Sequence, residues 1–582
     1  MKTRRLILIG MFVLAVLVVI FILGRPKPAT ILTPSPTPSS TTQPERTAIP
    51  TPEKISESLP IAQATPVYSF DDPDWWDHAV FYEIFVRSFY DSNGDGIGDL
   101  AGITQKLDYL NDGNPETTTD LGINAIWLMP IFPSPSYHGY DVTDYLTVNP
   151  DYGTLDDFKN LVAEAHKRGI HVIIDFVINH TSDKNQWFVN SLDLNSSYHD
   201  WYIWSKTSPG YLGPWGEKVW HQASNGLYYY GVFSSSMPDL NYRISAVTDQ
   251  IESIAKTWLT EMDIDGFRVD GARHLIEDGE TQVNTPETLA WFKNFRSLYK
   301  EWKPSAMSVG EVWDSSYVTT EYLKDQSFDI MFDFDLASAL VTTVGMGDAA
   351  SLSGSIQSEI TLYQDKGMAT FLTNHDMNRV MSALGGDVKR ASHAATALLT
   401  IPGTPFIYYG EEIGMVGEKP DEQIRTPMQW SGGAEAGFTS TSAWELPNFS
   451  YKTVNVDAEK GDKASLLSLY RDLVNIRLRH PALLSGKYIQ VQTSDPALYA
   501  ALSLEGNETL LTVINLGGKT ISSPVFTFSE PTLTGDYTLS LLLGSGVIDQ
   551  TVSIVPSGSA KEIHFANSIG PDQNLIFQLT AK

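Results

Sequence analysis

The chain has 582 residues, of which 42% are apolar, so it is long enough for more than one domain and for a sizeable core. Its formal charge of −29, from 40 basic and 69 acidic residues, argues against nucleic-acid binding, which requires a basic surface. The lack of cysteine excludes disulfides, thiolate metal sites and a lipid on an N-terminal cysteine.

The first residues favour an uncleaved membrane anchor over a removed signal peptide. Three basic residues among the first five precede an apolar run from Leu6 to Gly24. A spanning helix needs about 20 apolar residues, whereas the apolar part of a signal peptide has about 7–15. No clear small-x-small cleavage site follows the run. We therefore assign residues 1–24 to a membrane anchor or signal peptide and expect the rest of the chain to be extracytoplasmic.

The next segment, residues 25–66, is rich in Pro, Thr and Ser and has almost no aromatic side chains. Such a composition cannot build a core and predicts an extended tether. Aromatic residues become frequent from Tyr68 on, so we expect the folded body to begin near this point.

Short apolar runs then alternate with helix-like stretches such as 154–169 and 244–262. Eight such units predict an α/β fold, a parallel sheet closed into a (β/α)8 TIM barrel. The runs are apolar throughout, as expected for strands that are covered on both faces. The expected strands are the segments 79–89, 123–132, 171–179, 264–271, 306–313, 328–334, 368–376 and 404–414.

Residues 181–240, after the third strand segment, contain no convincing long helix and are rich in Trp, Tyr, Ser and Gly. A structureless loop of that length is uncommon in a compact domain, so we predict a small inserted domain. Its tryptophans are expected to form a small core rather than to stack on sugars: Trp201, Trp204, Trp215 and Trp220.

The barrel is accordingly assigned to residues 67–180 and 241–482. Strand-like segments dominate the remaining residues, 483–582. We predict that they form a C-terminal β-sandwich.

Acids, histidines and one arginine recur near the carboxyl ends of four expected strands, where TIM barrels place their chemistry. A single polar strand end is ordinary, because strands end at loops. Four such ends within apolar runs indicate a shared site. The side chains are Asp175, His180, Arg268, Asp270, Glu311, His375 and Asp376.

Two carboxylates on adjacent strands meet the requirement of glycosidic bond cleavage, in which one attacks the sugar carbon and the other protonates the leaving oxygen. Arg268 and Asp270 are two positions apart, so a strand would direct both to one face, and the cation should keep Asp270 ionised as the nucleophile. Glu311, between the apolar neighbours of SVGEVW, suits the acid with a raised pKa.

The stretches DFVINH, GFRVDGARH, GEVW and FLTNHD, in this order and spacing, resemble the α-amylase family of glycoside hydrolases, family 13. The resemblance covers roughly residues 75–580 and implies a barrel with a domain inserted after strand three and a terminal β-sandwich. By matching position it implies that Asp270 is the nucleophile and Glu311 the acid/base. It also implies that Asp376 binds sugar hydroxyls and stabilises the transition state.

The same resemblance implies a set of substrate-binding residues: Tyr140, Asp141, His180, Arg268, His375 and Arg425. In this set Arg268 orients the nucleophile, Tyr140 stacks on the sugar, and both histidines bond the sugar in the reactive subsite. Asp141 and Arg425 would close the pocket around the non-reducing end in exo-acting relatives. Asp175 is expected to be structural.

The segment DSNGDGIGD, which follows the first strand segment, predicts a calcium loop. Its oxygen donors at alternate positions can wrap a hard cation: Asp91, Asn93, Asp95, the carbonyl of Ile97, and Asp99. The alternative is an ordinary Asp/Gly turn, since a complete EF-hand loop would end in Glu where this chain has Gly102. Some members of the resembled family bind calcium with this loop, so we expect Ca²⁺ here.

The segment MPDLN, 237–241, looks intermediate between versions typical of oligo-1,6-glucosidases and of neopullulanases. We expect an extracytoplasmic, monomeric α-amylase that cleaves α-1,4 bonds of starch and malto-oligosaccharides with retention, since starch cannot enter a cell. The alternative is an exo-acting α-glucosidase or oligo-1,6-glucosidase, which IRTPMQW favours. A remote alternative is a non-catalytic amylase-like membrane accessory subunit. The presence of Asp270, Glu311 and Asp376 argues against it.

Overall fold

The computed structural model describes residues 69–582 except 365 and 548–549. The expected membrane anchor, 1–24, and the tether, 25–66, lie outside the described residues. Within the part of the chain that is described, no helix combines the length and the apolar character needed to cross a membrane.

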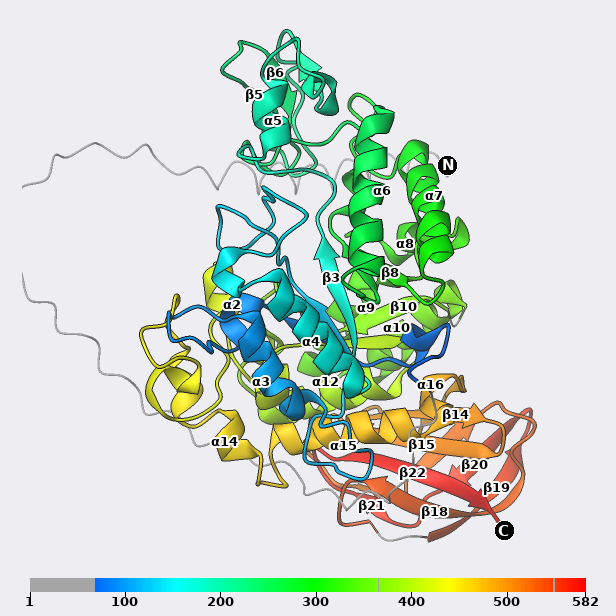
Figure 1. Ribbon diagram of the computed structural model, residues 1–582. Helices are drawn as coiled ribbons and strands as arrows, with labels where there is room; N and C mark the ends of the chain where they lie inside the picture. Colours follow the sequence, from blue (N-terminus) through cyan, green and yellow to red (C-terminus); the bar gives the residue numbers. More distant parts are fainter. Residues whose placement is uncertain (1–68, 365, 548–549) are drawn as a thin grey trace, which may run out of the picture. The chain divides into compact units, whose positions relative to one another are not determined.

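Eight short parallel strands close into a barrel, which confirms the predicted fold (Figure 1). Around the barrel they follow the order β1–β11–β10–β9–β8–β7–β3–β2. Every residue in them is buried, as expected for strands covered on both faces. Their bounds are β1 Phe81–Ile84, β2 Ala125–Leu128, β3 His171–Phe176, β7 Gly266–Val269, β8 Met307–Gly310, β9 Ile330–Phe332, β10 Met368–Phe371 and β11 Thr404–Tyr408.

The first strand is shorter than the sequence pattern predicts. The apolar run 79–89 was expected to be one strand, but β1 ends at Ile84 and Val86–Phe89 form the short helix α2. A run that is apolar throughout has no periodicity to separate strand from helix. The helix α2 also contacts a segment that is distant in the sequence, because the Ser88 hydroxyl donates to the carbonyl of Arg425 at 2.5 Å.

Helices follow or precede each strand and cover the barrel. Helix α4 is typical, because its apolar residues Phe158, Leu161, Val162 and Ala165 share one buried face and its first turn is closed by a Thr154 capping box. The main barrel helices are α3 Leu100–Leu110, α4 Leu155–Lys167, α6 Ser245–Thr260, α7 Pro286–Trp302, α8 Ser316–Lys324, α9 Phe334–Met346, α10 Ala349–Tyr363, α12 Val388–Thr400 and α15 Leu466–Arg479. Shorter helices lie in the connections and in the insert: α5 Gln186–Ser191, α11 Val380–Ala383, α13 Asp421–Ile424, α14 Val456–Glu459 and α16 Pro481–Leu484.

The segment between β3 and α6 contains α5 and a small antiparallel sheet in the order β4–β6–β5 (Figure 1). Its strands are β4 Trp204–Ser205, β5 Trp220–Gln222 and β6 Tyr228–Tyr230. A small cluster of Val219, Tyr230 and Val232 forms a core, against which Trp220 packs. Trp201 is buried, as predicted for a core residue of the insert, whereas Trp215 is 58% exposed and does not belong to a core.

Antiparallel strands fill the C-terminal region, in the orange and red layer of Figure 1. Nine of them form one sheet in the order β12–β14–β15–β22–β18–β19–β20–β17–β13, and β16 pairs with β21. The sheet curls over on itself, because its edge strands β12 and β13 are separated only by Val491. The bounds are β12 Lys487–Gln490, β13 Gln492–Thr493, β14 Leu498–Glu505, β15 Glu508–Asn515, β16 Ile521–Ser522, β17 Val525–Phe528, β18 Gly535–Leu543, β19 Gln550–Ser557, β20 Ala560–His564, β21 Ser568–Ile569 and β22 Asn574–Ala581.

The curled sheet has its own apolar core and a second apolar face on the barrel helices. Tyr499 and Ile514 belong to the same buried cluster as the barrel residues. Polar contacts add to this interface. Nδ1 of His393 in α12 lies 2.7 Å from Oδ1 of Asn574, and Nε2 of Gln490 donates to the hydroxyl of Ser353 at 2.9 Å. The sheet therefore braces one side of the barrel.

Candidate active site

A single arginine gathers three carboxylates at the carboxyl ends of β3, β7 and β8. Nη1 of Arg268 donates to both carboxylate oxygens of Asp175, at 2.8 and 2.9 Å, and to Oδ1 of Asp270 at 2.8 Å. Nη2 lies 2.9 Å from Oε2 of Glu311. Arg268 is only 1% exposed. The strand register causes this meeting, since Asp175 lies directly beside Arg268 in the β3–β7 pair.

Gly271, next to Asp270, provides a second hydrogen bond that positions Glu311. The backbone N–H of Gly271 donates to Oε2 of Glu311 at 2.8 Å. Gly271 has φ of 50°, and a Cβ here would lie 2.7 Å from Cζ of Phe233. Only glycine suits both the backbone conformation and the close approach of Phe233.

The third predicted acid, Asp376, joins this centre through hydrogen-bonded neighbours. Its Oδ1 lies 2.8 Å from Nη2 of Arg425, and its Oδ2 lies 3.2 Å from Nε2 of His375. The same Nε2 lies 2.6 Å from the hydroxyl of Tyr140, which donates to Asp175 at 3.1 Å. A continuous network thus connects all three predicted catalytic acids.

Two further predicted residues lie beside this network. Nε2 of the buried His180 contacts the carbonyl of Tyr140 at 3.0 Å, and burial lowers the pKa of His180, which keeps it neutral. The ring of Tyr140 stacks on His375, with the ring centres 5.6 Å apart. His180 and His375 therefore hold Tyr140 from its backbone and from its hydroxyl.

Asp141 and Arg425 are not joined by a hydrogen bond or ion pair in the described part of the chain. Asp141 is buried and accepts hydrogen bonds from the hydroxyls of Ser134 and Ser136. Arg425 instead binds Asp376 and donates from Nε to the carbonyl of His375 at 2.9 Å. That Asp141 and Arg425 close the pocket around a non-reducing end stays a prediction.

The environments of two acids shift their pKa values in opposite directions. Burial raises the pKa of Glu311, and the charges of Asp270 and Asp376 add to this effect against the opposing Arg268. Burial also opposes ionisation of Asp376, but His375 and Arg425 outweigh it and hold the pKa of Asp376 well below its usual range. One carboxyl can thus carry a proton while another stays ionised.

Sequence reasoning missed Glu83, which lies in the middle of β1. Its Oε1 is 2.5 Å from Nδ1 of His375, so it orients the ring that contacts Asp376. The signal available in the sequence was a lone acid within the apolar run FYEI. Acids in or next to other apolar segments indicated the other site residues.

The predicted calcium loop is ordered by its own side chains. Asp91 accepts backbone N–H bonds from Asn93 and Gly96 at 3.0 and 2.8 Å. Asp95 accepts from Ile97 at 2.9 Å. Asp99 accepts from Gly102 and thereby caps α3. In the described residues, no three His, Asp or Glu side chains form a group that could hold a metal ion. The loop therefore has oxygen donors but no preformed cluster of acidic side chains.

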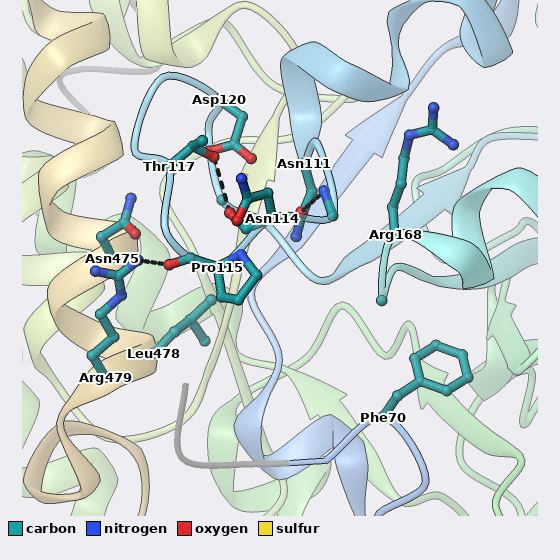
Figure 2. A pocket seen from close by; sticks show the side chains of 13 residues that line it. Phe70, Asn111, Asn114, Pro115, Thr117, Asp120, Arg168, Asn475, Leu478 and Arg479 are labelled. Atoms are coloured by element: carbon teal, nitrogen blue, oxygen red, sulfur yellow. Dashed lines mark hydrogen bonds between the residues drawn. The ribbon is translucent and has the colours of Figure 1, made fainter. Parts of the chain in front are cut away.

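A cavity of about 200 Å³ lies at the opposite end of the barrel (Figure 2). Its lining includes Gly122 and Gly169, which shortly precede β2 and β3, and Arg479 of α15, whose Nη2 donates to the carbonyl of Pro115 at 2.9 Å. None of the predicted site residues lines it. The amino ends of TIM-barrel strands serve stability rather than catalysis, so the carboxyl-end cluster is the better candidate site.

Comparisons with known proteins show the family to which the chain is related. The sequence model of the α-amylase catalytic domain matches residues 83–486. An α-amylase of Dictyoglomus thermophilum is 40% identical over 460 residues, 78% of this chain and 87% of that protein. An oligo-1,6-glucosidase of Parageobacillus thermoglucosidasius is 32% identical, over 78% of this chain and 92% of its own. The crystal structure of an α-amylase from H. orenii has a TM-score of 0.76 at 40% identity, covering 86% of this chain and 99% of that one.

His375 predicts a stability that depends on pH. Burial lowers its pKa, but Asp376 and Glu83 more than compensate and raise it from 6.5 to about 9. The folded protein holds this proton more tightly than the unfolded chain, so the stabilisation is complete below pH ~6.5 and is lost as the pH rises through ~9. We expect the free energy of unfolding to fall by about 3 kcal/mol over that window, measured by denaturant unfolding at several pH values.

The control separates His375 from the rest of the protein. His375→Gln should lack this part of the pH dependence. His564→Gln, whose side chain is 62% exposed in the C-terminal sheet, should keep it. An equal slope for wild type and His375→Gln would contradict the assignment.

Proposed function

This chain belongs to the α-amylase family of glycoside hydrolases, and within that family we propose that it is an α-amylase that hydrolyses α-1,4 bonds of starch and malto-oligosaccharides with retention. The observation that carries the proposal is the buried Arg268, which contacts Asp270 and Glu311 at once. The opposite pKa shifts of Glu311 and Asp376 support a division of roles among the acids.

In the proposed reaction the carboxylate of Asp270 attacks the anomeric carbon while Glu311 gives its proton to the departing glycosidic oxygen. The C–O bond to the leaving chain breaks and a glycosyl ester on Asp270 forms. Glu311, now a carboxylate, takes a proton from water, whose oxygen attacks the anomeric carbon and releases Asp270. Asp376, kept ionised by His375 and Arg425, accepts hydrogen bonds from the sugar hydroxyls.

An exo-acting α-glucosidase or oligo-1,6-glucosidase is the second candidate. It is supported by the oligo-1,6-glucosidase relative. The segment IRTPMQW, which contains Arg425, also favours it. A non-catalytic accessory subunit is set aside, because the relatives and the intact acid network belong to a glycoside hydrolase.

The location of the protein is proposed from its substrate and its first residues. Starch is too large to enter a cell, so an enzyme that degrades it works outside. The charged start and apolar run of residues 1–24 would hold the enzyme at the membrane or direct its export. Fractionation of cells that express the full chain, followed by detection of the N-terminal segment, distinguishes an anchored from a released enzyme.

Calcium binding by the loop 91–99 is proposed on its donor chemistry. Hydrogen bonds from Thr439 and from backbone N–H groups outweigh the effect of burial and lower the pKa of Asp91, so a fixed negative charge lies in the loop. Oxygen donors at alternate positions suit a hard cation: Asp91, Asn93, Asp95, the carbonyl of Ile97, and Asp99. Bound calcium would fix this loop at the start of α3.

Removal of calcium provides a test by stability alone. At a free calcium concentration about 100 times the Kd, the free energy of unfolding should rise by about 2.7 kcal/mol over the value in chelator. Asp95→Asn should reduce this response. Asp193→Asn, which alters an exposed turn of the insert, should not. Identical melting curves with calcium and with chelator would refute the site.

The nucleophile and the acid can be tested separately. Asp270→Asn should lower kcat on starch by at least about a thousandfold. Glu311→Gln should lose about 10²-fold more activity on starch than on α-maltosyl fluoride, because fluoride leaves without a proton. Asp144→Asn, an exposed acid in the connection after β2, is the control and should stay active. Equal losses on both substrates for Glu311→Gln would contradict its role as the acid.

The products of soluble starch distinguish the two candidate functions. We expect long fragments early in the time course, because an α-amylase cuts within the chain, and NMR should detect the α anomer first, since a retaining enzyme preserves configuration. Glucose as the sole early product would favour the exo-acting alternative. A first-formed β anomer would contradict the retaining mechanism.

A further inference from the structure

A strained turn lies in the long connection that follows β11. Its three consecutive residues Glu435, Ala436 and Gly437 all have left-handed backbone conformations, with φ of 47°, 56° and 71°. Residues other than glycine adopt this conformation at an energetic cost, and normally one at a time. Such strain persists only where surrounding contacts impose it, and it is typical of ligand clamps and switch regions. The next residues, 438–444, are held by a distant part of the chain.

Residues 438–444 lie along the loop 91–99, and we refer to these two segments together as the clasp. At the start of the clasp, the N–H of Asp91 donates to the carbonyl of Phe438 at 3.1 Å. The hydroxyl of Thr439 donates to Oδ2 of Asp91 at 2.5 Å. Asp91 thus binds the second segment through both its backbone and its side chain.

The rest of the clasp is bonded through backbone carbonyls of the loop. The hydroxyl of Thr441 donates to the carbonyl of Gly94 at 3.0 Å, and the N–H of Trp444 donates to the carbonyl of Gly96 at 2.8 Å. Thr441 and Gly94 are 347 residues apart in the sequence, so only the folded barrel brings the two segments together.

The two segments of the clasp are also in close steric contact. A Cβ on Gly96 would lie 2.2 Å from the carbonyl oxygen of Ser442, and a Cβ on Gly94 would lie 2.8 Å from the hydroxyl oxygen of Ser440. Both glycines have positive φ, of 95° and 84°. A change in the backbone of the loop at these positions is therefore transmitted directly to residues 440–442.

The clasp uses the same loop as the proposed calcium donors. Asp91 is the first of these donors, and its Oδ2 also accepts the hydrogen bond from Thr439. The carbonyl groups of Gly94 and Gly96 lie on either side of Asp95, another proposed donor. A loop that is fixed around a cation therefore also has the acceptors of the clasp fixed.

A serine connects the clasp to the active site. The hydroxyl of the buried Ser88, in α2, accepts a hydrogen bond from Nε1 of Trp444 at 3.0 Å and donates to the carbonyl of Arg425 at 2.5 Å. Nη2 of Arg425 in turn lies 2.8 Å from Oδ1 of Asp376. Contacts of the clasp therefore continue, through Trp444 and Ser88, to the arginine that helps to keep Asp376 ionised.

We propose that calcium binding in the loop 91–99 closes the clasp, and that the closed clasp holds Arg425 in place against Asp376. This inference rests on the calcium binding proposed above for the same loop. In the loaded protein the bonds of the clasp offset the strain of the turn 435–437. In the empty protein the clasp opens more readily, because the turn relaxes when it is released.

Because coupling of this kind is reciprocal, a variant with a weakened clasp must bind calcium less tightly. Thr441→Val removes one bond of the clasp and changes neither a proposed calcium donor nor a residue of the active site. We expect its Kd for calcium, measured by titration calorimetry, to rise about 2- to 10-fold.

Thr257→Val is the matched control. The hydroxyl of Thr257, in α6, also donates to a backbone carbonyl at 3.0 Å at an exposed position, but it lies outside the clasp. Its Kd for calcium should equal that of the wild type.

Hydrogen exchange followed by mass spectrometry measures the clasp itself. In the wild type, calcium should slow amide exchange in residues 435–444, and Thr441→Val should need a higher calcium concentration for the same effect. The value of kcat/KM on starch should follow the same calcium dependence, and saturating calcium should restore the activity of Thr441→Val.

The outcomes separate the clasp from the proposals on which it rests. Calcium that binds without changing exchange in residues 435–444, or an unaltered Kd in Thr441→Val, would overturn the clasp and leave the calcium site intact. A wild type with no heat of calcium binding and no change in exchange would overturn the calcium site and the clasp with it. A protein that shows both calcium responses but does not hydrolyse starch would refute the proposed activity and still support the clasp.

Discussion

The guanidinium of Arg268 is the interaction on which the rest of the site depends. It is 1% exposed and contacts the carboxylates of Asp175, Asp270 and Glu311. Removing charged groups from water costs several kcal/mol for each ion unless good geometry compensates. Arginine meets this need because its planar fork directs separate N–H groups at different oxygens, which a single lysine ammonium cannot do. The barrel can therefore keep several acids close together in its interior.

A second set of contacts gives those acids different properties. His375 is held between Glu83 and Asp376, and Arg425 contacts Asp376 from the other side. These cations keep Asp376 ionised, and its charge in turn helps to raise the pKa of Glu311. The same kind of side chain thus becomes a fixed anion in one place and a proton carrier in another. Neighbours, and not residue type, decide the difference.

The barrel and the insert contribute unlike parts of the site. Strand ends supply the acids, because backbone hydrogen bonds on both sides of a barrel strand hold each residue in a fixed register. The insert supplies Trp215 and Phe233 to a cavity that Glu311 also lines. The acids are therefore held in place by the barrel strands, while one part of the neighbouring cavity is lined by a segment with its own small core.

Local patterns in the sequence determined much of this protein. The eight barrel strands lie within the apolar segments expected of them, because burial on both faces requires continuous apolar runs. The even spacing of Arg268 and Asp270 predicted that both point to one face, and they are joined at 2.8 Å. Asp270 and Glu311 directly follow β7 and β8, whereas Asp376 lies beyond the end of β10 and was assigned through the family resemblance.

Only the tertiary structure decided which distant groups meet. Glu83 and His375 are 292 residues apart, and their contact exists because the barrel closes β1 beside strands from the end of the chain. Arg425 likewise contacts Asp376, which lies 49 residues away, and residues 86–89 form a helix within a run that was expected to be strand. Four tryptophans of the insert looked alike in sequence, yet Trp215 alone of them is mostly exposed. Burial depends on what packs against a side chain, and that information lies in the folded chain as a whole.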